Sequence, residues 1–400
     1  MGRRLGYLIP EFPGQTHIFF WREIAALRNM GEDVYIISTR RPRPIVCQHD
    51  FAKPSTAETH YLFPPSAAHL STWFAEFCPR LPKALEYGGT IGALGPKSFP
   101  RFLGLLASAI DLVYWARRKG IQHIHCHSCA DSAHVTALAR QMGGPPYSLT
   151  LHGDLDIYGT HHRAKMEYAS FISAVGSHLR EQIRTRVGIP VERLRASYMG
   201  VEVGKLASLG RDRQTVPGRL HLATVARLHP AKGHMHVLAA IRRGVQEGLD
   251  LHYTIAGAGP FLDAITSKVS ELDLRDRVTM LGTISSEEVE ALLDRIDAFV
   301  LASTGQGEAW PVSIMEAMGA GLPVIASRIG ATPEMITPGV DGFLIGQRDE
   351  DALLESIGAL ANDLELRLRI GSAARNTTLQ RFDVSATASA LRDAIYASEC

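Results

Sequence analysis

The sequence predicts an α/β protein built from two Rossmann-like domains that face each other across a cleft. Its 400 residues are enough for two hydrophobic cores. Short apolar runs alternate with helical patterns in both halves, which is typical of parallel sheets covered by helices. Polar and turn residues at 200–218 separate the halves. We expect domains at 1–200 and 201–380, with a helix at about 381–400 that packs back on the first.

The first half contains six candidate strands, with helical patterns between them. The strands are "LGYLIP", "DVYIIS", "IQHIHC", "YSLTL", "FISAV" and "RASYM", and the helices lie near 17–30, 131–141 and 177–186. Their order gives repeated βαβ units and therefore a parallel sheet. Residues 50–100 show no clear periodicity, so no element is assigned there.

The same rhythm restarts after the linker. Strands are predicted at "LHLATVA", "LHYTIAG", "RVTML", "DAFVLAS" and "LPVIAS", and helices begin at Gly233, Pro260, Ser286 and Pro311. Open parallel sheets bind ligands at the carboxyl ends of their strands. We therefore expect the functional residues at those ends.

Composition excludes several classes of protein. The net charge of +1 gives no general attraction for nucleic acid. Five scattered cysteines favour a reducing compartment over a disulfide framework. The N-terminal residues do not form a secretory signal, and the apolar run at 102–116 is too short for a membrane span and contains Asp111. A cytoplasmic protein is expected.

Two patterns suggest a metal site but have simpler explanations. Cys126 and Cys129 form a CxxC among histidines, yet no second cluster accompanies them, and the segment is typical of a strand end followed by a helix capped by Asp131 or Ser132. The sequence "DLD" at 154–156 is of the metal-binding DxD type, but it follows a strand in a double Rossmann pattern. We expect no metal.

Arg227 and Lys232 follow the strand "LHLATVA" and lie just before the helix at Gly233. Two cations beside a helix N-terminus suit a phosphate or diphosphate, although a solvated loop is the alternative. Gly257, in "AGAGPF", would let a ligand approach the backbone. The third glycine of a dinucleotide fingerprint is absent.

The stretch "GEAWPVSIMEAMGAGLPVIAS" places one carboxylate before a helix and another inside it. Pro311 suits the first helical turn, and free amides near Val312 and Ser313 could hold an anion. Glu308 and Glu316 would then each accept hydrogen bonds from the hydroxyls of one sugar, on either side of a diphosphate.

As an ordered set, these motifs resemble the retaining glycosyltransferases of family 4, which have the GT-B fold. The resemblance covers 220–346 almost continuously, through "ARLHPAKGH", "AGAGP", "VTMLGTIS", "EAWPVSIMEAMGAGLPVIAS", "GATPEMI" and "DGFLI". The first half is similar more loosely, through "YLIPEFPGQTHIFFWREIAALRNMGEDV", "HIHCH", "LTLHGDLDIY" and "YMGVEV". These patterns are similar to the branch that makes bacterial exopolysaccharide and lipopolysaccharide, including colanic-acid-type enzymes.

The resemblance implies transfer of a sugar from a nucleoside diphosphate sugar to a saccharide or lipid-linked saccharide, without a cofactor or metal. It implies that Arg227 and Lys232 bind the diphosphate, Glu316 the ribose and Glu308 the donor sugar. His152 would lie beside the transferring sugar, so His152 and Glu308 are the catalytic candidates. The implied donor-binding residues are Gly14, Arg227, Lys232, Gly257, Leu281, Ala309, Trp310, Pro311, Val312 and Glu316. Ala309 departs from the glycine that is common after the first glutamate.

Two other functions remain open: a sugar-nucleotide 2-epimerase and a non-catalytic scaffold of the same fold. Sugar transfer to an acceptor would exclude the epimerase, and the intact Arg227, Lys232, Glu308 and Glu316 speak against the scaffold. A peripheral contact with the inner face of the membrane is also expected if the acceptor is lipid-linked. The basic "RRPRP" loop and the apolar helix at 103–115 would make that contact, unless the helix belongs to the core.

Overall fold

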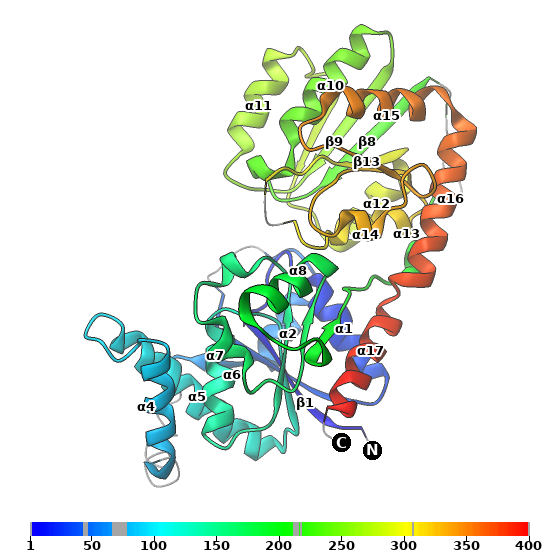
Figure 1. Cartoon of the computed structure of the whole chain (residues 1–400). Coiled ribbons are helices and arrows are strands. Elements are labelled where there is room, and N and C mark those ends of the chain that lie inside the picture. The colour runs from blue at the N-terminus through cyan, green and yellow to red at the C-terminus, as the bar shows by residue number, and fades with distance from the viewer. Residues whose placement is uncertain are drawn as a thin grey trace. The chain divides into compact units, whose positions relative to one another are not determined.

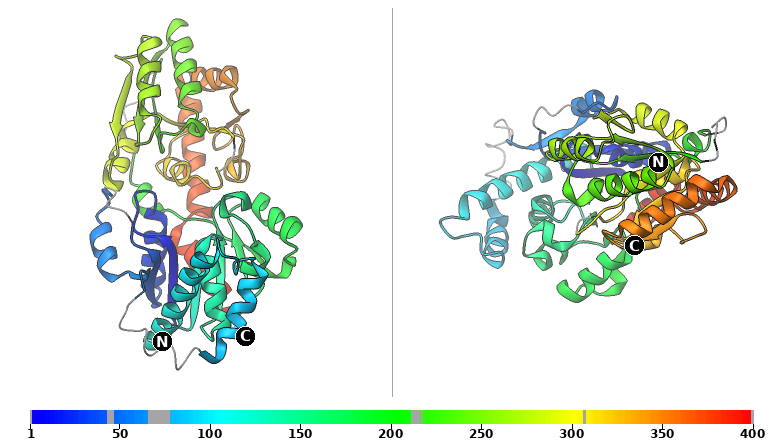
Figure 2. Two further views of the ribbon diagram at one scale, coloured as in Figure 1. Left: turned by 90° about the vertical axis from the view of Figure 1, so that its left-hand side faces the viewer. Right: turned by 90° about the horizontal axis from the view of Figure 1, so that it is seen from above.

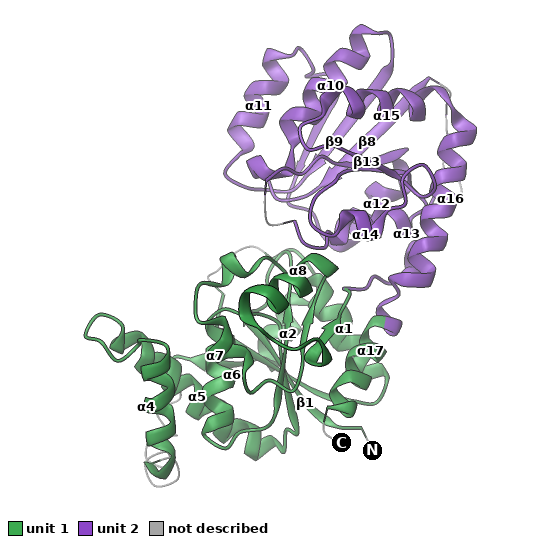
Figure 3. Cartoon of the chain, in the orientation of Figure 1, with its two compact units in different colours: residues 1–198, 387–400 green, residues 199–386 purple. Residues whose placement is uncertain are grey.

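The computed structural model describes residues 2–42, 47–65, 78–210, 216, 218–305 and 308–398. The chain divides into two compact units (Figure 3). Unit 1 comprises Met1–Tyr198 and Thr387–Cys400, and unit 2 comprises Met199–Ala386. Each unit contains one parallel sheet with helices packed against it (Figure 1). The predicted α/β class with two Rossmann-like domains is confirmed.

The sheet of unit 1 has the strand order β3-β2-β1-β4-β5-β6-β7, and the strand pairs are parallel. Its strands are β1 (Arg4–Glu11), β2 (Asp33–Arg40), β3 (His60–Phe63), β4 (His123–Cys126), β5 (Tyr147–Leu151), β6 (Ile172–Ala174) and β7 (Leu194–Ala196). β4 and β5 are buried along their whole length, as expected for strands covered on both faces.

The helices of unit 1 connect these strands and cover the sheet (Figure 2). They are α1 (Ile18–Asn29), α2 (Ala52–Glu58), α4 (Leu81–Thr90), α5 (Phe99–Lys119), α6 (Asp131–Gln141), α7 (His162–Met166) and α8 (Ser177–Gln182). The chain returns to this unit in α17 (Val384–Ala397), where the Tyr396 hydroxyl donates to Glu32 at 2.6 Å and the Arg3 guanidinium lies over the Tyr396 ring.

The sheet of unit 2 has the order β10-β9-β8-β11-β12-β13. Its strands are β8 (Arg219–Val225), β9 (Asp250–Ala256), β10 (Val278–Gly282), β11 (Ala298–Leu301), β12 (Val324–Ser327) and β13 (Phe343–Ile345). Its helices are α9 (Val203–Leu206), α10 (His234–Gln246), α11 (Leu262–Glu271), α12 (Ser286–Arg295), α13 (Val312–Gly319), α14 (Thr332–Met335), α15 (Glu350–Asn362) and α16 (Leu364–Arg381). α15 packs on α10, and α16 packs on α13.

The strand order reverses direction at one place in each sheet. In unit 1 the chain moves outward from β1 to β3 and then returns to β4, beside β1. In unit 2 it moves outward from β8 to β10 and returns to β11, beside β8. Connections leave a parallel sheet in opposite directions at such a switch point, which opens a crevice at the carboxyl ends of the two strands. The loops after β1, β4, β8 and β11 are therefore positioned to hold a ligand.

Most of the predicted elements are confirmed, and the differences have local causes. The stretch left unassigned contains α2, β3 and α4, which are short. In α2, Ser55 is the one buried residue, so no periodic pattern could appear. The start of α6 is confirmed, but Ala130 is its N-cap residue and no side chain caps the helix. Likewise Pro311 is the N-cap residue of α13 rather than its first helical residue, so the helix begins one position later than predicted, at Val312.

The apolar helix predicted near 103–115 lies within α5. Among the described residues, α5 is the one helix long and apolar enough to cross a membrane by length and composition, and half of its apolar window is buried in the protein. Phe102, Leu112 and Val113 are fully buried, whereas Phe99 and Leu103 are exposed. This helix is therefore a core element that also presents apolar side chains to the outside.

Candidate active site

Lys232 lies in a short turn that connects β8 to α10. The turn, Pro230–Lys232, is a 3-10 helix that ends at Gly233, where φ is +73°. A Cβ atom at Gly233 would lie 1.7 Å from the carbonyl oxygen of Ala302, just beyond β11. Glycine is therefore required here, because α10 begins directly against the end of the neighbouring strand. This close approach brings Lys232 to the end of β11.

Lys232 and Glu308 form an ion pair in unit 2. Lys232 Nζ donates to Glu308 Oε2 at 2.5 Å, and the Ser303 hydroxyl donates to the same oxygen at 2.7 Å. The lysine and glutamate side chains are 18% and 9% exposed, so water screens the pair weakly. A further bond, from Thr304 N to the Ala231 carbonyl at 2.8 Å, ties the two loops together. The structure thus joins two predicted site residues that are 76 positions apart.

The backbone around Glu308 is held by the loop after β12. Gly330 has a φ of +54°, and a Cβ atom there would lie 1.6 Å from the Glu308 carbonyl oxygen. Ala331 N donates to the Ala309 carbonyl at 3.1 Å. Gly330 belongs to the "GATPEMI" motif, so the structure gives that motif a physical role: it fixes the segment that carries Glu308.

The start of α13 follows at once. Trp310 is buried, and its Nε1 donates to Met315 Sδ at 3.2 Å. Ala309 is buried as well, so contacts of these two residues with a ligand would involve the backbone. Glu316 lies on α13 and is 9% exposed. Val312 begins the helix, and the first amides of a helix have no partner within it.

The other predicted donor-site residues of unit 2 lie at the neighbouring strand ends. Arg227 is exposed just after β8, and Leu281, near the end of β10, is 41% exposed. Gly257 has a φ of +143°, and a Cβ atom there would lie 1.9 Å from the Ala226 carbonyl oxygen. The close approach of the Ala226 carbonyl therefore requires glycine at position 257 even without a ligand. The sequence analysis had explained this glycine by the approach of a ligand to the backbone.

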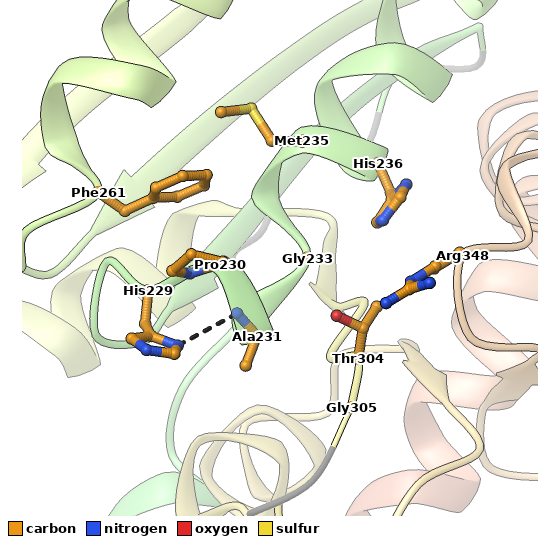
Figure 4. Close-up of a pocket in the computed structure, with 10 residues that line it drawn as sticks. All are labelled: His229, Pro230, Ala231, Gly233, Met235, His236, Phe261, Thr304, Gly305 and Arg348. Atoms are coloured by element: carbon orange, nitrogen blue, oxygen red, sulfur yellow. Dashed lines mark hydrogen bonds between the residues drawn. The ribbon is translucent and has the colours of Figure 1, made fainter.

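A pocket of about 440 Å³ adjoins the Lys232 turn (Figure 4). Figure 4 shows the Phe261 ring across from the Arg348 guanidinium, with the side chain of Thr304 near Arg348. The full lining is His229, Pro230, Ala231, Gly233, Met235, His236, Phe261, Thr304, Gly305 and Arg348. The sequence alone did not point to His236 or Arg348, which lie outside the quoted motifs, and in "AGAGPF" it pointed to Gly257 rather than to Phe261.

The predicted residues of unit 1 lie after β1 and β5. Gly14 precedes α1, and a Cβ atom there would lie 2.7 Å from His17 Nδ1, so a larger residue would displace the His17 ring. His152 follows β5, and its Nε2 lies 3.1 Å from His127 Nδ1. Burial, and to a lesser extent the neighbouring His127, lowers the pKa of His152 to about 3. His152 is therefore a neutral imidazole at neutral pH.

The two patterns considered for metal binding make other contacts. Asp154 accepts from Gln182 Nε2 at 2.7 Å, and Asp156 pairs with Arg186 at 2.5 Å. Burial raises the pKa values of Cys126 and Cys129 to about 12, so both are thiols at neutral pH. No group of three or more metal-binding side chains occurs within the described ranges of the chain.

Both halves of the chain match known glycosyltransferase families. Residues 18–205 match the model of Glycosyltransferase Family 4, and residues 211–377 match that of Glycosyl transferases group 1. The amylovoran biosynthesis glycosyltransferase AmsK of Erwinia amylovora is 28% identical over 366 residues, 88% of each chain. The putative colanic acid biosynthesis glycosyltransferase WcaL of Escherichia coli is 32% identical over 180 residues, 44% of each chain.

Solved structures agree on the fold. A glycosyltransferase from Rickettsia africae superposes with a TM-score of 0.73 at 16% identity, covering 98% of both chains. HepE of Anabaena, in complex with UDP, superposes with a TM-score of 0.73 at 18% identity, covering 99% of this chain and 100% of that one. With two parallel-sheet domains and both family models matched in order, the chain is a glycosyltransferase of the GT-B fold, composed of a family 4 domain followed by a group 1 domain.

Proposed function

We propose that this glycosyltransferase moves a sugar from a nucleoside diphosphate sugar to a saccharide or lipid-linked saccharide, with retention of anomeric configuration, in the synthesis of cell-surface polysaccharide. The observation that carries the proposal is the Lys232–Glu308 pair at the switch point of unit 2. The name of AmsK, a glycosyltransferase of amylovoran biosynthesis, and the solved HepE complexes with UDP and UDP-glucose support the same reading.

The diphosphate would bind where positive charge gathers in unit 2. Lys232 supplies a fixed ammonium group, Arg227 an exposed guanidinium group, and the start of α13 supplies amides from Val312 onward. Negative charge on the leaving diphosphate grows as its bond to the anomeric carbon breaks. Donors already in place stabilise that charge without reorganising, so electrostatics supplies most of the rate.

Glu308 would bind the donor sugar rather than attack it. Its Oε2 already accepts from Lys232 and from Ser303, and two donors on one oxygen lower its nucleophilicity. No hydrogen bond to its other oxygen, Oε1, is seen among the described residues. That oxygen can accept hydrogen bonds from sugar hydroxyls, while Glu316 on α13 does the same for the ribose.

Retention would then come from attack on the same face that the diphosphate leaves. The C–O bond to the phosphate breaks, and the acceptor oxygen bonds to the anomeric carbon. The proton of the acceptor hydroxyl passes to the departing phosphate oxygen. This reaction requires no metal. It also requires no nucleophile from the enzyme, in contrast to the reaction of retaining glycoside hydrolases.

The acceptor would bind to unit 1, where apolar side chains are exposed around α4 and α5. Figure 1 shows α4 projecting from this unit, and its Leu85 is exposed together with Phe99 and Leu103 of α5. Such a patch supports peripheral contact with the cytoplasmic face of a membrane that holds a lipid-linked acceptor. Of the basic loop, Arg40 pairs with Glu11 at 2.7 Å, and residues 43–46 lie outside the described part.

A panel of nucleotide sugars tests the proposal. The purified protein is incubated with each, and both protection from thermal melting and release of nucleoside diphosphate are measured. At least one nucleotide sugar is expected to raise the melting temperature and to be turned over. The Lys268→Ala variant, which removes a lysine that pairs with Glu271 on the surface, should behave like the wild type in both measurements. The absence of protection by every nucleotide sugar would refute the proposal.

A further inference from the structure

A chain of buried polar groups runs through unit 1 and ends at His152. The Tyr7 hydroxyl donates to Glu23 Oε1 at 2.8 Å, and His127 Nε2 lies 3.3 Å from the same oxygen. His127 Nδ1 then faces His152 Nε2 at 3.1 Å. These residues come from β1, α1 and the ends of β4 and β5, so the topology brings them together at the carboxyl edge of the sheet.

The carboxylate of Glu23 fixes the direction of this chain. Glu23 Oε1 and His127 Nε2 are in close contact without the geometry of a hydrogen bond, and both side chains are at most 10% exposed. If His127 carried its proton on Nδ1, the lone pair of Nε2 would face Glu23 Oε1, an oxygen that already accepts from Tyr7, in a poorly screened interior. The proton is therefore more stable on Nε2.

The next step follows from the short distance between the two rings. With its proton on Nε2, His127 presents a bare Nδ1 to His152. The 3.1 Å contact is then attractive when His152 carries its proton on Nε2. That leaves His152 Nδ1 as a bare nitrogen, and this atom is buried and has no hydrogen-bond partner among the residues that the structure describes.

The surroundings favour this arrangement over competing ones. Burial lowers the pKa of His127 to about 3, as it does for His152, so both rings are neutral and a single proton per ring must be placed. His125 packs against His127, but its Nδ1 and Nε2 contact Ser148 and Thr150 at 2.7 and 2.9 Å. His125 is therefore not available as a partner for His152.

We propose that Glu23, acting through His127, is a positioning residue that fixes the tautomer of His152, so that His152 Nδ1 accepts a hydrogen bond from a hydroxyl of the bound sugar. The inference rests on the proposed function. An unpaired buried acceptor carries a desolvation penalty, and a donor hydroxyl removes it. The partly buried Phe19 ring lies beside His152, with the two ring centroids 5.3 Å apart.

The tautomers can be read directly by ¹⁵N NMR of histidine-labelled protein, because protonated and bare imidazole nitrogens have well-separated shifts. The signals are assigned from their loss in His127→Asn and His152→Gln. The proposal predicts a protonated Nε2 and a bare Nδ1 for both rings in the wild type. A protonated Nδ1 on His152 would overturn it, and this result needs no variant to be active.

Two substitutions at His127 distinguish a packing role of its ring from the relay, by which we mean the control of the His152 tautomer by Glu23 through His127. In His127→Asn, the amide oxygen can replace Nδ1 and still accept from His152, whereas His127→Leu offers no acceptor. We expect His127→Leu to release the tautomer preference of His152 and to lower kcat by about ten- to a hundredfold, the range for loss of a partner that orients an imidazole. His127→Asn should retain the tautomer and most of the activity, as should the remote His252→Gln.

Equal tautomer populations at His152 in the wild type and His127→Leu would overturn the relay. Equal kcat losses in His127→Asn and His127→Leu would overturn it as well. If instead no nucleotide sugar is turned over by the wild type, the proposed function fails, and the tautomer measurement still decides whether the relay exists.

Discussion

Replacing Lys232 with alanine should weaken binding of the nucleoside diphosphate strongly, for two reasons. One concerns the contact of Lys232 with the diphosphate, and the other its ion pair with Glu308. The first is loss of a charge-assisted hydrogen bond to the diphosphate, worth about 1.5–3 kcal/mol. At about 1.4 kcal/mol per factor of ten, this alone raises Kd by about ten- to a hundredfold. Glu316→Ala should cost a similar amount, because it also removes one charged partner.

The second reason concerns Glu308, which loses its cation in the Lys232→Ala variant. Its side chain is 9% exposed, and it would keep Ser303 as its partner while facing a diphosphate of the same charge. Two such charges about 5 Å apart repel by about 3 kcal/mol at an effective dielectric constant of about 20. Lys232→Ala should therefore weaken binding more than Glu316→Ala does, and adding Glu308→Gln should restore part of the loss.

Isothermal titration calorimetry with UDP, GDP and ADP measures these effects, with Lys268→Ala as the control that should bind like the wild type. Circular dichroism and thermal melting establish that each variant is folded. Unchanged affinity in both Lys232→Ala and Glu316→Ala would refute the diphosphate assignment. A double variant that binds more weakly than Lys232→Ala would refute the repulsion argument.

Further predictions concern metal, pH, backbone and membrane. Chelator should leave sugar transfer unchanged; loss restored by magnesium would contradict this. Burial lowers the pKa values of His127 and His134 to about 3 in the folded protein. The free energy of unfolding should therefore fall as the pH drops from about 6.5 to about 3, by up to about 1.4 kcal/mol per pH unit for each ring. Denaturant titrations at several pH values measure this fall, and a free energy that does not change with pH would contradict the prediction. Gly233→Ala should lower the melting temperature and Gly358→Ala, in open helix, raise it; equal effects would refute the close approach. The wild type should float with anionic vesicles at low salt and Leu103→Ser less so; wild type remaining in solution would refute membrane contact.

The fold was predictable because its signals are local. Each strand of unit 2 up to β12 is a short apolar run, and α6 was placed with its observed bounds. The region containing α2 and β3 was not predictable, since elements of seven and four residues with one buried residue each show no periodicity. Their position is set by tertiary contacts, such as the pairing of β3 with β2.

The candidate site was predictable in its parts and not in its connections. Strand ends and glycines pointed to Lys232 and Glu308 separately, but their ion pair depends on the close packing of Gly233 against Ala302, which only the folded chain reveals. The contact between His127 and His152 is likewise non-local. In the sequence, the histidines around Cys126 and Cys129 were weighed as a metal site against a strand end followed by a helix, and neither interpretation pointed to a hydrogen-bonded chain.

The stereochemistry of the product tests the central claim most directly. The nucleotide sugar that the protein turns over is supplied with a saccharide acceptor, and the anomeric configuration of the new glycosidic bond is read from NMR coupling constants of the product. The account predicts that an α-linked donor gives an α-linked product, with the nucleoside diphosphate released in equal amount. A β-linked product would contradict attack on the face that the diphosphate leaves, and with it the assigned role of Glu308.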